Sequence, residues 1–319
     1  MHPYAALTPE VVLDALSALG LRPDGRLLAL SSYENRVYQV WLEDEPPVVT
    51  KFYRPGRWSH AQIEEEHAFA HELAEREIPV VAPQASSSFA DFRLAVYPRR
   101  GGRSPELGDP KTLEWIGRFM GRIHAVGSTK RFTHRESLTA KSFGHDSRAY
   151  LLSTPFIPRD LLDAWKAVTE QALQLVEACN ARAGDVTTIR LHGDCHPGNI
   201  LWTDEGPHFV DLDDARMGPA MQDLWMLLSG DRASMSRQLR KVLEGYEQFM
   251  QFDRKELNLL EALRTLRLIH YSAWIARRWN DPAFPAAFPW FNTQRYWQDR
   301  ILELREQIAL MQEEPLAVD

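Results

Sequence analysis

The sequence has few cysteines, no long apolar run and no excess of positive charge. Cys179 and Cys195 are the only cysteines among 319 residues, which excludes a disulfide framework and favours a reducing compartment. No stretch of about 18 apolar residues occurs, and the first residues show no signal-peptide pattern. The formal net charge of −7 argues against a non-specific nucleic-acid binder. We therefore expect a cytoplasmic monomer with no nucleic-acid or membrane partner.

The first hundred residues are predicted to be mainly β-structure with one substantial helix. Alternating apolar and polar residues indicate strands, and apolar residues at helical spacing after Ser59 indicate the helix. In chain order we expect a short helix from Pro9 capped by Thr8 and stopped at Gly20, a strand–turn–strand over Leu27–Asp44, a third strand within Pro46–Pro55, the main helix over Ser59–Glu77, and strands over Val80–Gln84 and from Phe92.

Helices are predicted to dominate after a linker rich in Gly and Pro, Arg99–Pro110. They are expected over Asp109 to about Val126 and over residues 160–181, 220–229, 233–251, 255–279 and 293–312, with a short strand pair between Asn199 and Ala215. We predict an α+β protein with a small antiparallel sheet lobe over residues 1–97 and a larger helical lobe over 98–319. The hinge is expected at about residues 95–103.

The stretch "LHGDCHPGNILW", Leu191 to Trp202, concentrates acidic, thiol, imidazole and amide groups. A zinc site could use His192, Cys195 and His196, but the chain contains neither CxxC nor HExxH. A thiol nucleophile would pair Cys195 with His196, although adjacency in sequence does not bring two side chains together. Neither interpretation has further support in the sequence.

Spacing favours phosphoryl transfer instead. Asp194 and Asn199 lie five residues apart, as in the HRDxxxxN loop of kinases, and Asp211 follows twelve residues later at the end of an apolar strand. Such a reaction needs one carboxylate to orient the attacking hydroxyl, and an amide oxygen with a second carboxylate to hold magnesium. The alternative is a polar loop without chemistry.

The N-terminal half supplies the matching groups. Lys51 lies on the predicted third strand, where kinases place the lysine that contacts the α- and β-phosphates. Three glutamates, Glu64 to Glu66, follow on the next helix and could hold that lysine. Lys51 and the glutamates are each separately compatible with a solvated surface. Their order along the chain, followed by Asp194, Asn199 and Asp211, favours a kinase.

"LHGDCHPGNILW" followed by "FVDLDDARMGPAMQDLW" resembles the aminoglycoside phosphotransferase and choline kinase group, whose fold is similar to that of protein kinases. "SYENRVYQV", "KFYRPGRWS" and "DPAFPAAFPW" more closely resemble bacterial serine/threonine protein kinases of the stress response kinase A type. The resemblance implies an enzyme of the stress response that uses ATP and Mg²⁺ to phosphorylate a protein substrate. A small-molecule kinase acting on an aminoglycoside, choline or a sugar is the alternative, and a catalytically dead relative is a third hypothesis.

By position, the resemblance implies roles for eleven residues. They are Asp194 as catalytic base, Asn199 and Asp211 as magnesium ligands, Lys51 at the phosphates, Glu66 as the partner of Lys51, Ser31, Ser32 and Asn35 in the phosphate-covering loop, Val96 and Tyr97 beside adenine, and Asp223 as a brace of the catalytic loop.

Several residues depart from the kinase pattern. The phosphate loop has no GxGxxG, the HRD arginine is Gly193, and DFG has become Asp211-Leu212-Asp213. Without an APE motif, and with Asp223 only twelve residues beyond Asp211, no long activation loop fits. Asp213 and Asp214 could assist the metal or occupy the turn, and we favour the turn. The substrate and any autophosphorylation site are not predicted.

Overall fold

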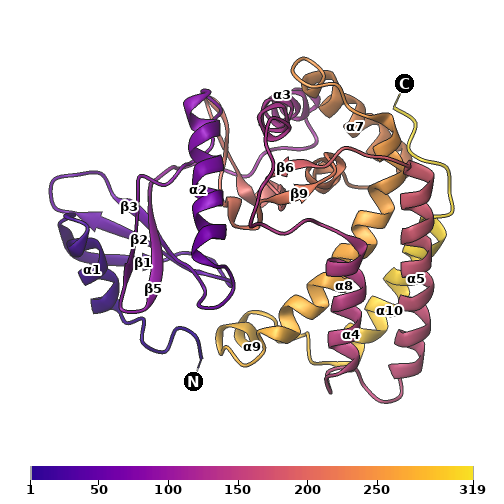
Figure 1. Cartoon of the computed structure of the whole chain (residues 1–319), viewed down its shortest axis with the longest axis horizontal. Helices are drawn as coiled ribbons and strands as arrows, with labels where there is room; N and C mark the ends of the chain where they lie inside the picture. Colours follow the sequence, from indigo (N-terminus) through magenta and orange to yellow (C-terminus); the bar gives the residue numbers. More distant parts are fainter. Residues whose placement is uncertain (1, 319) are drawn as a thin grey trace. The chain divides into compact units, whose positions relative to one another are not determined.

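The computed structural model describes residues 2–318, which form two compact units. The first contains residues up to Pro105 together with Gly198–Asp213, and the second contains Glu106–Pro197 and Asp214 onward. Figure 1 shows the elements of each unit along the chain. The lobe boundary near residues 95–103 stays a prediction, since the compact units draw on non-contiguous segments.

The first unit is built on a five-stranded antiparallel sheet of order β1-β2-β3-β5-β4. One face packs against α1 (Pro9–Ala18), whose first turn is capped by the Thr8 hydroxyl as predicted. The apolar contacts between α1 and the sheet make the core of this unit. The strands are β1 (Pro23–Ala29), β2 (Arg36–Leu42), β3 (Val48–Phe52), β4 (Ala85–Phe89) and β5 (Phe92–Pro98).

The main helix of this unit, α2 (His60–Glu75), begins where the sequence predicts. Ser59 forms a capping box with Gln62, so two otherwise unpaired backbone N–H groups are satisfied. Ile63, Phe69 and Leu73 are buried on one face of the helix. The same helix also buries a charged residue, Glu66, which belongs to the candidate site.

The strand predicted over Val80–Gln84 is wrong. Val80 makes only an isolated bridge with Phe209, and the edge strand is β4, with the sequence ASSSF. An edge strand has neighbours on one side only, so its serines reach solvent and carry no apolar periodicity. Backbone pairing with β5 therefore formed a strand that the hydrophobic pattern does not reveal.

The predicted strand pair is a hairpin, β7 (Ile200–Thr203) and β8 (Gly206–Phe209), and it belongs to the first unit. The amide of Phe209 donates to the Pro79 carbonyl at 2.8 Å, and the Val81 amide donates to the Phe209 carbonyl at 2.9 Å. Arg103 and Trp202 exchange two further backbone hydrogen bonds. These hydrogen bonds attach the hairpin to segments that lie 99 to 130 positions earlier in the chain (202 − 103 and 209 − 79).

The second unit is mainly helical. Its apolar core gathers side chains from α4, α5, α8 and α10, including the fully buried Trp165 and Trp297. A short antiparallel pair joins β6 (Ile189–Leu191) to β9 (Arg216–Gly218), and this pair was not predicted. The helices are α3 (Pro110–Gly127), α4 (Asp146–Leu152), α5 (Leu162–Ala183), α6 (Met221–Leu224), α7 (Arg232–Tyr246), α8 (Leu260–Arg277), α9 (Ala283–Ala287) and α10 (Gln294–Leu310).

Some predicted helices differ from those observed. The segment 220–229 holds only the single turn of α6 and a 3-10 turn, Trp225–Leu227, and 255–279 is divided into a 3-10 helix over Arg254–Leu259 and α8. A π-helix over Ala140–His145, α4 and α9 were not predicted. These are short elements, for which tertiary packing outweighs local periodicity.

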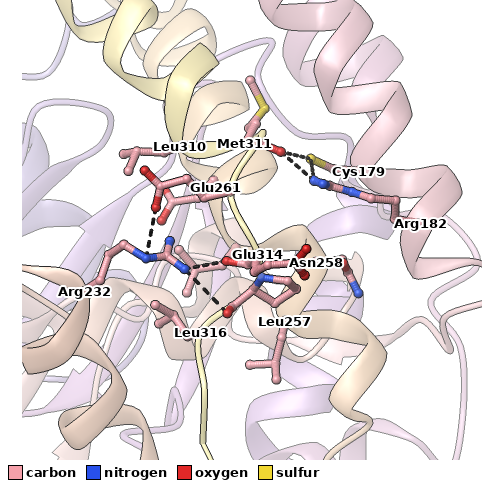
Figure 2. Close-up of a pocket in the computed structure, with 13 residues that line it drawn as sticks. Cys179, Arg182, Arg232, Leu257, Asn258, Glu261, Leu310, Met311, Glu314 and Leu316 are labelled. Atoms are coloured by element: carbon pink, nitrogen blue, oxygen red, sulfur yellow. Dashed lines mark hydrogen bonds and ion pairs between the residues drawn. The ribbon is translucent and has the colours of Figure 1, made fainter.

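The C-terminal segment is fixed to the second unit by two arginines (Figure 2). The Arg182 guanidinium donates to the Met311 carbonyl at 2.6 Å, and Arg232 donates to the carbonyls of Glu314 and Pro315. The cavity beneath them measures about 20 Å³, which is room for little more than a water molecule. Within residues 2–318, no helix combines the length and apolarity needed to cross a membrane.

Candidate active site

Lys51 and Glu66 form a buried ion pair in the first unit. Lys51 lies in β3, and its Nζ is 2.9 Å from Oε1 of Glu66 on α2. Burial is the largest single effect and would lower the pKa of the lysine, but Glu66, Tyr53, Tyr97 and Asp213 together outweigh it, and the pKa lies well above its ordinary value. Lys51 is therefore a fixed, charged amine. Of the three adjacent glutamates, Glu66 is the one in contact with it.

Two tyrosines and a histidine surround this pair, and none of these contacts was predicted. Nζ of Lys51 lies 4.6 Å from the centre of the Tyr53 ring and 5.5 Å from that of Tyr97. The Tyr53 hydroxyl lies 2.8 Å from Nε2 of His67 and 3.4 Å from both carboxylate oxygens of Glu66. The aromatic faces restrict the ammonium group to a narrow space.

Asp211 follows β8 and approaches the same lysine. Its Oδ1 is 3.6 Å from Nζ of Lys51, while 51% of its side chain remains exposed. The backbone of Asp211 has φ of 61°, a left-handed conformation that a non-glycine residue adopts at a cost. The arrangement thus holds one carboxylate between the lysine and solvent, where a ligand can reach it.

Asn199 lies at the other end of the same hairpin connection. Its carbonyl accepts a hydrogen bond of 3.0 Å from the amide of Val210, the residue before Asp211. The hairpin therefore returns the chain from Asn199 to Asp211, and the first unit contains both predicted metal ligands. The candidate ligands are an amide and a carboxylate, which offer the hard oxygen donors that suit Mg²⁺.

Asp213 is buried, whereas Asp211 is half exposed. Only 4% of the Asp213 side chain is exposed; Oδ1 is 3.7 Å from Nζ of Lys51, and Oδ2 contacts the Arg57 guanidinium. Two cations thus neutralise a buried carboxylate that few solvent species can reach. This environment agrees with the alternative favoured in the sequence analysis, in which Asp213 occupies the turn and does not assist the metal.

The predicted nucleotide contacts lie in two segments of the first unit. Ser31 is exposed, and the Ser32 hydroxyl donates to the Asn35 carbonyl at 3.2 Å. The buried side chain of Asn35 accepts a hydrogen bond from the Arg54 amide at 3.1 Å. Asn35 therefore ties the loop to the end of β3.

Val96 and Tyr97 lie on β5, beside β3. The carbonyl of Val96 accepts a hydrogen bond of 2.7 Å from the Gln84 amide, and its side chain is buried in the sheet core. The Tyr97 ring lies against Lys51, as described above, and its hydroxyl is 3.2 Å from that of Tyr53. Tyr97 is the one of the two whose side chain reaches the site.

Asp194 belongs to the second unit. Its Oδ1 is 2.7 Å from Nη1 of Arg267 on α8, and its Oδ2 is 3.7 Å from Nε2 of His196. The carboxylate is 22% exposed. Arg267 lies 73 residues further along the chain than Asp194 (267 − 194), and no local pattern in the sequence pointed to it.

Asp223 braces the loop before Asp194, and this prediction is confirmed. Its two carboxylate oxygens each accept a hydrogen bond of 2.8 Å, from the amides of His192 and Gly193. His124 Nε2 lies 3.1 Å from the same carboxylate, and His124 Nδ1 lies 3.0 Å from the Tyr246 hydroxyl. All of these groups are buried, so the loop is held by a network that solvent does not disturb.

The replacement of the kinase arginine by Gly193 has a steric reason. Gly193 has φ of +87°, and a Cβ at this position would lie 2.1 Å from the Asp214 carbonyl oxygen. No other residue fits this backbone without displacing the chain. The glycine allows the Asp194 loop to pass close to Asp214.

The zinc and thiol hypotheses are not supported by the structure. Over residues 2–318 no group of three or more His, Cys, Asp or Glu residues is arranged to hold a metal ion. Cys195 is fully buried, and burial raises the pKa of its thiol well above the ordinary value, which suppresses the reactive thiolate. Its sulfur lies 3.5 Å from that of Met120.

Comparisons with known proteins show which family the chain resembles. Residues 26–260 match the profile of the phosphotransferase enzyme family. The chain is 45% identical over 318 residues to proteins named stress response kinase A from Salmonella choleraesuis and Escherichia coli K12, covering 98% of this chain and 96% of each relative. A relative from Salmonella typhimurium with the same identity and coverage is named serine/threonine protein kinase RdoA.

Solved structures show the same fold at low sequence identity. The amicoumacin kinase hAmiN, solved with AMP-PNP and Ca²⁺, is 16% identical with a TM-score of 0.73 over 96% of this chain and 94% of that one. Choline kinase LicA from Streptococcus pneumoniae is 15% identical with a TM-score of 0.64 over 94% and 98%. The predicted α+β fold of the protein kinase-like type is confirmed, and the chain belongs to the phosphotransferase enzyme family.

Proposed function

We propose that this chain is an ATP-dependent serine/threonine protein kinase. The observation that carries the proposal is the joint contact of Lys51 with Glu66 at 2.9 Å and with Asp211 at 3.6 Å within one compact unit. A lysine fixed by a helix glutamate and facing an exposed carboxylate is the arrangement with which kinases bind a nucleotide phosphate and its metal. The relatives at 45% identity, which are named as kinases, support the same function.

In this proposal the first unit holds MgATP. Lys51 contacts the α- and β-phosphates, Glu66 keeps the lysine in place, and adenine lies along the segment that contains Val96 and Tyr97. Asn199 and Asp211 would hold Mg²⁺, which neutralises charge on the phosphate oxygens when it is bound. Ser31 and Ser32 cover the phosphates, whereas the inward side chain of Asn35 supports the shape of their loop.

The second unit supplies the base. Asp194 orients the acceptor hydroxyl and takes its proton as the hydroxyl oxygen forms a bond to the γ-phosphorus. The bond from that phosphorus to the β–γ bridging oxygen breaks, and its electron pair leaves with ADP. Asp223 holds the backbone of the Asp194 loop by two hydrogen bonds, which limits the positions that the base can take.

The test is transfer of labelled phosphate from ATP in the presence of Mg²⁺. The full chain is incubated alone, with casein or myelin basic protein, and with kanamycin or choline. Label in protein is expected, and Asp194→Ala should abolish it while ATP binding is retained. Label in kanamycin or choline only would favour a small-molecule kinase, and unchanged turnover by Asp194→Ala would overturn the assignment of the base.

A further inference from the structure

Glu256 is a buried acid to which the proposed reaction gives no role. It lies in the 3-10 helix Arg254–Leu259 and is only 4% exposed. Its Oε2 accepts a hydrogen bond of 2.7 Å from the amide of Met221, the first residue of α6, 35 positions earlier in the chain (256 − 221). Burying a carboxylate is costly, so a contact that keeps this one in place needs a reason.

Helix α6 depends on this contact because it cannot hold its own first turn. It has four residues, and an isolated turn of that length is unstable without support from the rest of the fold. Ala220, the residue before it, has no side chain that could accept a hydrogen bond from the first amides. Glu256 replaces the missing cap, and its negative charge is stabilised by the amides of both Met221 and Ala220.

The same turn carries the groups that hold the loop of Asp194. Asp223 accepts hydrogen bonds of 2.8 Å from the amides of His192 and Gly193. The side-chain amide of Gln222 donates to the carbonyl of Gly193 at 3.2 Å. Asp223 and Gln222 are both buried. Because Asp194 follows Gly193 directly, a shift of α6 would move the candidate base.

Tyr246 on α7 faces the same carboxylate. The phenol keeps its proton, since burial and next the charge of Glu256 raise its pKa. Its hydroxyl lies 3.0 Å from Nδ1 of His124, and Nε2 of His124 lies 3.1 Å from the Asp223 carboxylate. Glu256 and Asp223 therefore act on one buried network of polar groups.

Protonation of Glu256 would weaken its hold on α6. Burial, the largest effect, raises the pKa of Glu256 from 4.5 to about 7; Asp253 raises it further, and the amides of Met221 and Ala220 oppose the rise. On the alkaline side of this value the carboxylate accepts charge-assisted hydrogen bonds. On the acid side the neutral carboxyl accepts weaker ones, so α6 is held less firmly.

On the basis of the proposed kinase function, we propose that Glu256 is a positioning residue that fixes the Asp194 loop through α6 and, by taking up a proton, slows phosphate transfer in mild acid. Glu256 acts through Met221 and Asp223, without contact with the reacting atoms. The effect is expected in kcat and not in the KM for ATP, because the nucleotide is assigned to the first unit and Glu256 belongs to the second.

The test measures kcat and the KM for ATP from about pH 5.5 to about pH 8.5 with labelled ATP and casein. The full chain is compared with its Glu256→Gln and Glu256→Asp variants. Glu261→Gln is the matched control, since Glu261 is also a buried acid whose pKa is raised by burial, but it pairs with Arg264 on α8. Hydrogen exchange of the loop amides is followed by mass spectrometry in each protein and needs no turnover.

The kcat of the native chain is expected to fall by about three- to tenfold as the pH decreases through about 7, with the KM for ATP unchanged. In mild alkali, Glu256→Gln should have the low kcat that the native chain has in acid. It should show no step near neutral pH, and its amides of His192 and Gly193 should exchange faster. Glu256→Asp keeps the charge and should restore part of the step, whereas Glu261→Gln should keep the native profile.

An unchanged step in Glu256→Gln, or loop amides that exchange as slowly as in the native chain, would overturn the inference and leave the kinase function in place. A flat native profile across neutral pH would overturn the role of the proton even if Glu256→Gln failed to fold. Absence of label in every protein and small molecule would instead overturn the kinase proposal. The exchange rates would then still decide whether Glu256 holds the loop.

Discussion

Lys51 and Glu66 contact each other through side chains that are only 6% and 3% exposed, so each charge depends on the other for compensation. Such pairs add little net stability over an apolar pair of the same shape, yet removing one partner leaves an uncompensated buried charge. In this chain Asp211 and Asp213 also lie within 4 Å of the lysine. Loss of Glu66 would let Lys51 move toward these acids and away from its present position.

Glu66→Ala is expected to lower the free energy of unfolding by about 3–5 kcal/mol, because it breaks a buried pair. It should also weaken ATP binding, since the displaced lysine no longer faces the phosphates. Urea denaturation and nucleotide titration measure the two effects. Glu64→Ala is the control on the same helix: Glu64 pairs with Arg93 but is half exposed, and its loss should cost less than about 1 kcal/mol. Similar losses of unfolding free energy and of ATP affinity in both variants would contradict the dependence of Lys51 on Glu66.

Asp211 and Asp213 are expected to respond differently to the same substitution. Asp211→Asn should weaken the Mg²⁺-dependent part of nucleotide binding by tenfold or more with little loss of stability, because its carboxylate is half exposed. Asp213→Asn should mainly destabilise the fold, since it leaves Arg57 and Lys51 with less negative charge. Titration of nucleotide binding against Mg²⁺ and urea denaturation separate the effects. If Asp213→Asn were as stable as the native chain and lost the Mg²⁺ dependence, the roles would be reversed.

These contrasts indicate what the sequence could and could not predict. The roles assigned to Lys51, Asp194, Asn199 and Asp211 follow from residue type and spacing, since phosphoryl transfer needs those groups in that order, and they stay predictions. The contact of Glu66 with Lys51 follows from the resemblance, which selected it from three adjacent glutamates. The α+β fold follows from the spacing of apolar residues, which alternate with polar residues in the predicted strands and recur at helical spacing in the predicted helices.

The contacts that the sequence could not predict join distant segments. Arg267 lies on α8, and the packing of the buried face of α8 determines which side of the helix faces Asp194. No pattern in the sequence near Arg267 predicts that contact. Strand β4 was missed because pairing with β5, and not apolar alternation, makes it a strand. The hairpin of Asn199 and Asp211 joins the first unit through backbone hydrogen bonds to Pro79, Val81 and Arg103, and such bonds cannot be predicted from the side chains.

Gly193 is expected to tolerate no side chain. Alanine there would adopt a left-handed φ of +87° and bring its Cβ to 2.1 Å from the Asp214 carbonyl oxygen. Gly25 is a matched control, since its φ is +93° and an added Cβ meets no atom within 4 Å. Gly25→Ala should cost about 1–2 kcal/mol for the backbone conformation alone. Gly193→Ala should cost about 1–3 kcal/mol more for the overlap, and should also lower kcat. Equal unfolding free energies for the two variants would exclude the steric explanation.

His67 is expected to make the protein less stable in acid. Burial, reinforced by the positive charge of Lys51, lowers the pKa of His67 from 6.5 to about 4. Below about pH 6.5 the unfolded chain therefore binds a proton that the folded chain excludes, so stability falls as the pH decreases toward 4, by up to about 3 kcal/mol. Above pH 6.5 this contribution is fully present.

His67→Gln should flatten this part of the pH dependence, because glutamine does not titrate and still offers Tyr53 a polar partner. The free energy of unfolding in urea, measured at about pH 7.5 and about pH 4.5, should change less between the two conditions than in the native chain. His71→Gln serves as the control, since His71 is exposed on the same helix. This variant should still lose stability in acid, because burial, the main cause of the lowered pKa of His67, is unchanged. If His67→Gln lost as much stability in acid as the native chain, another group would cause the acid sensitivity. Burial would then not be what keeps His67 neutral beside Tyr53.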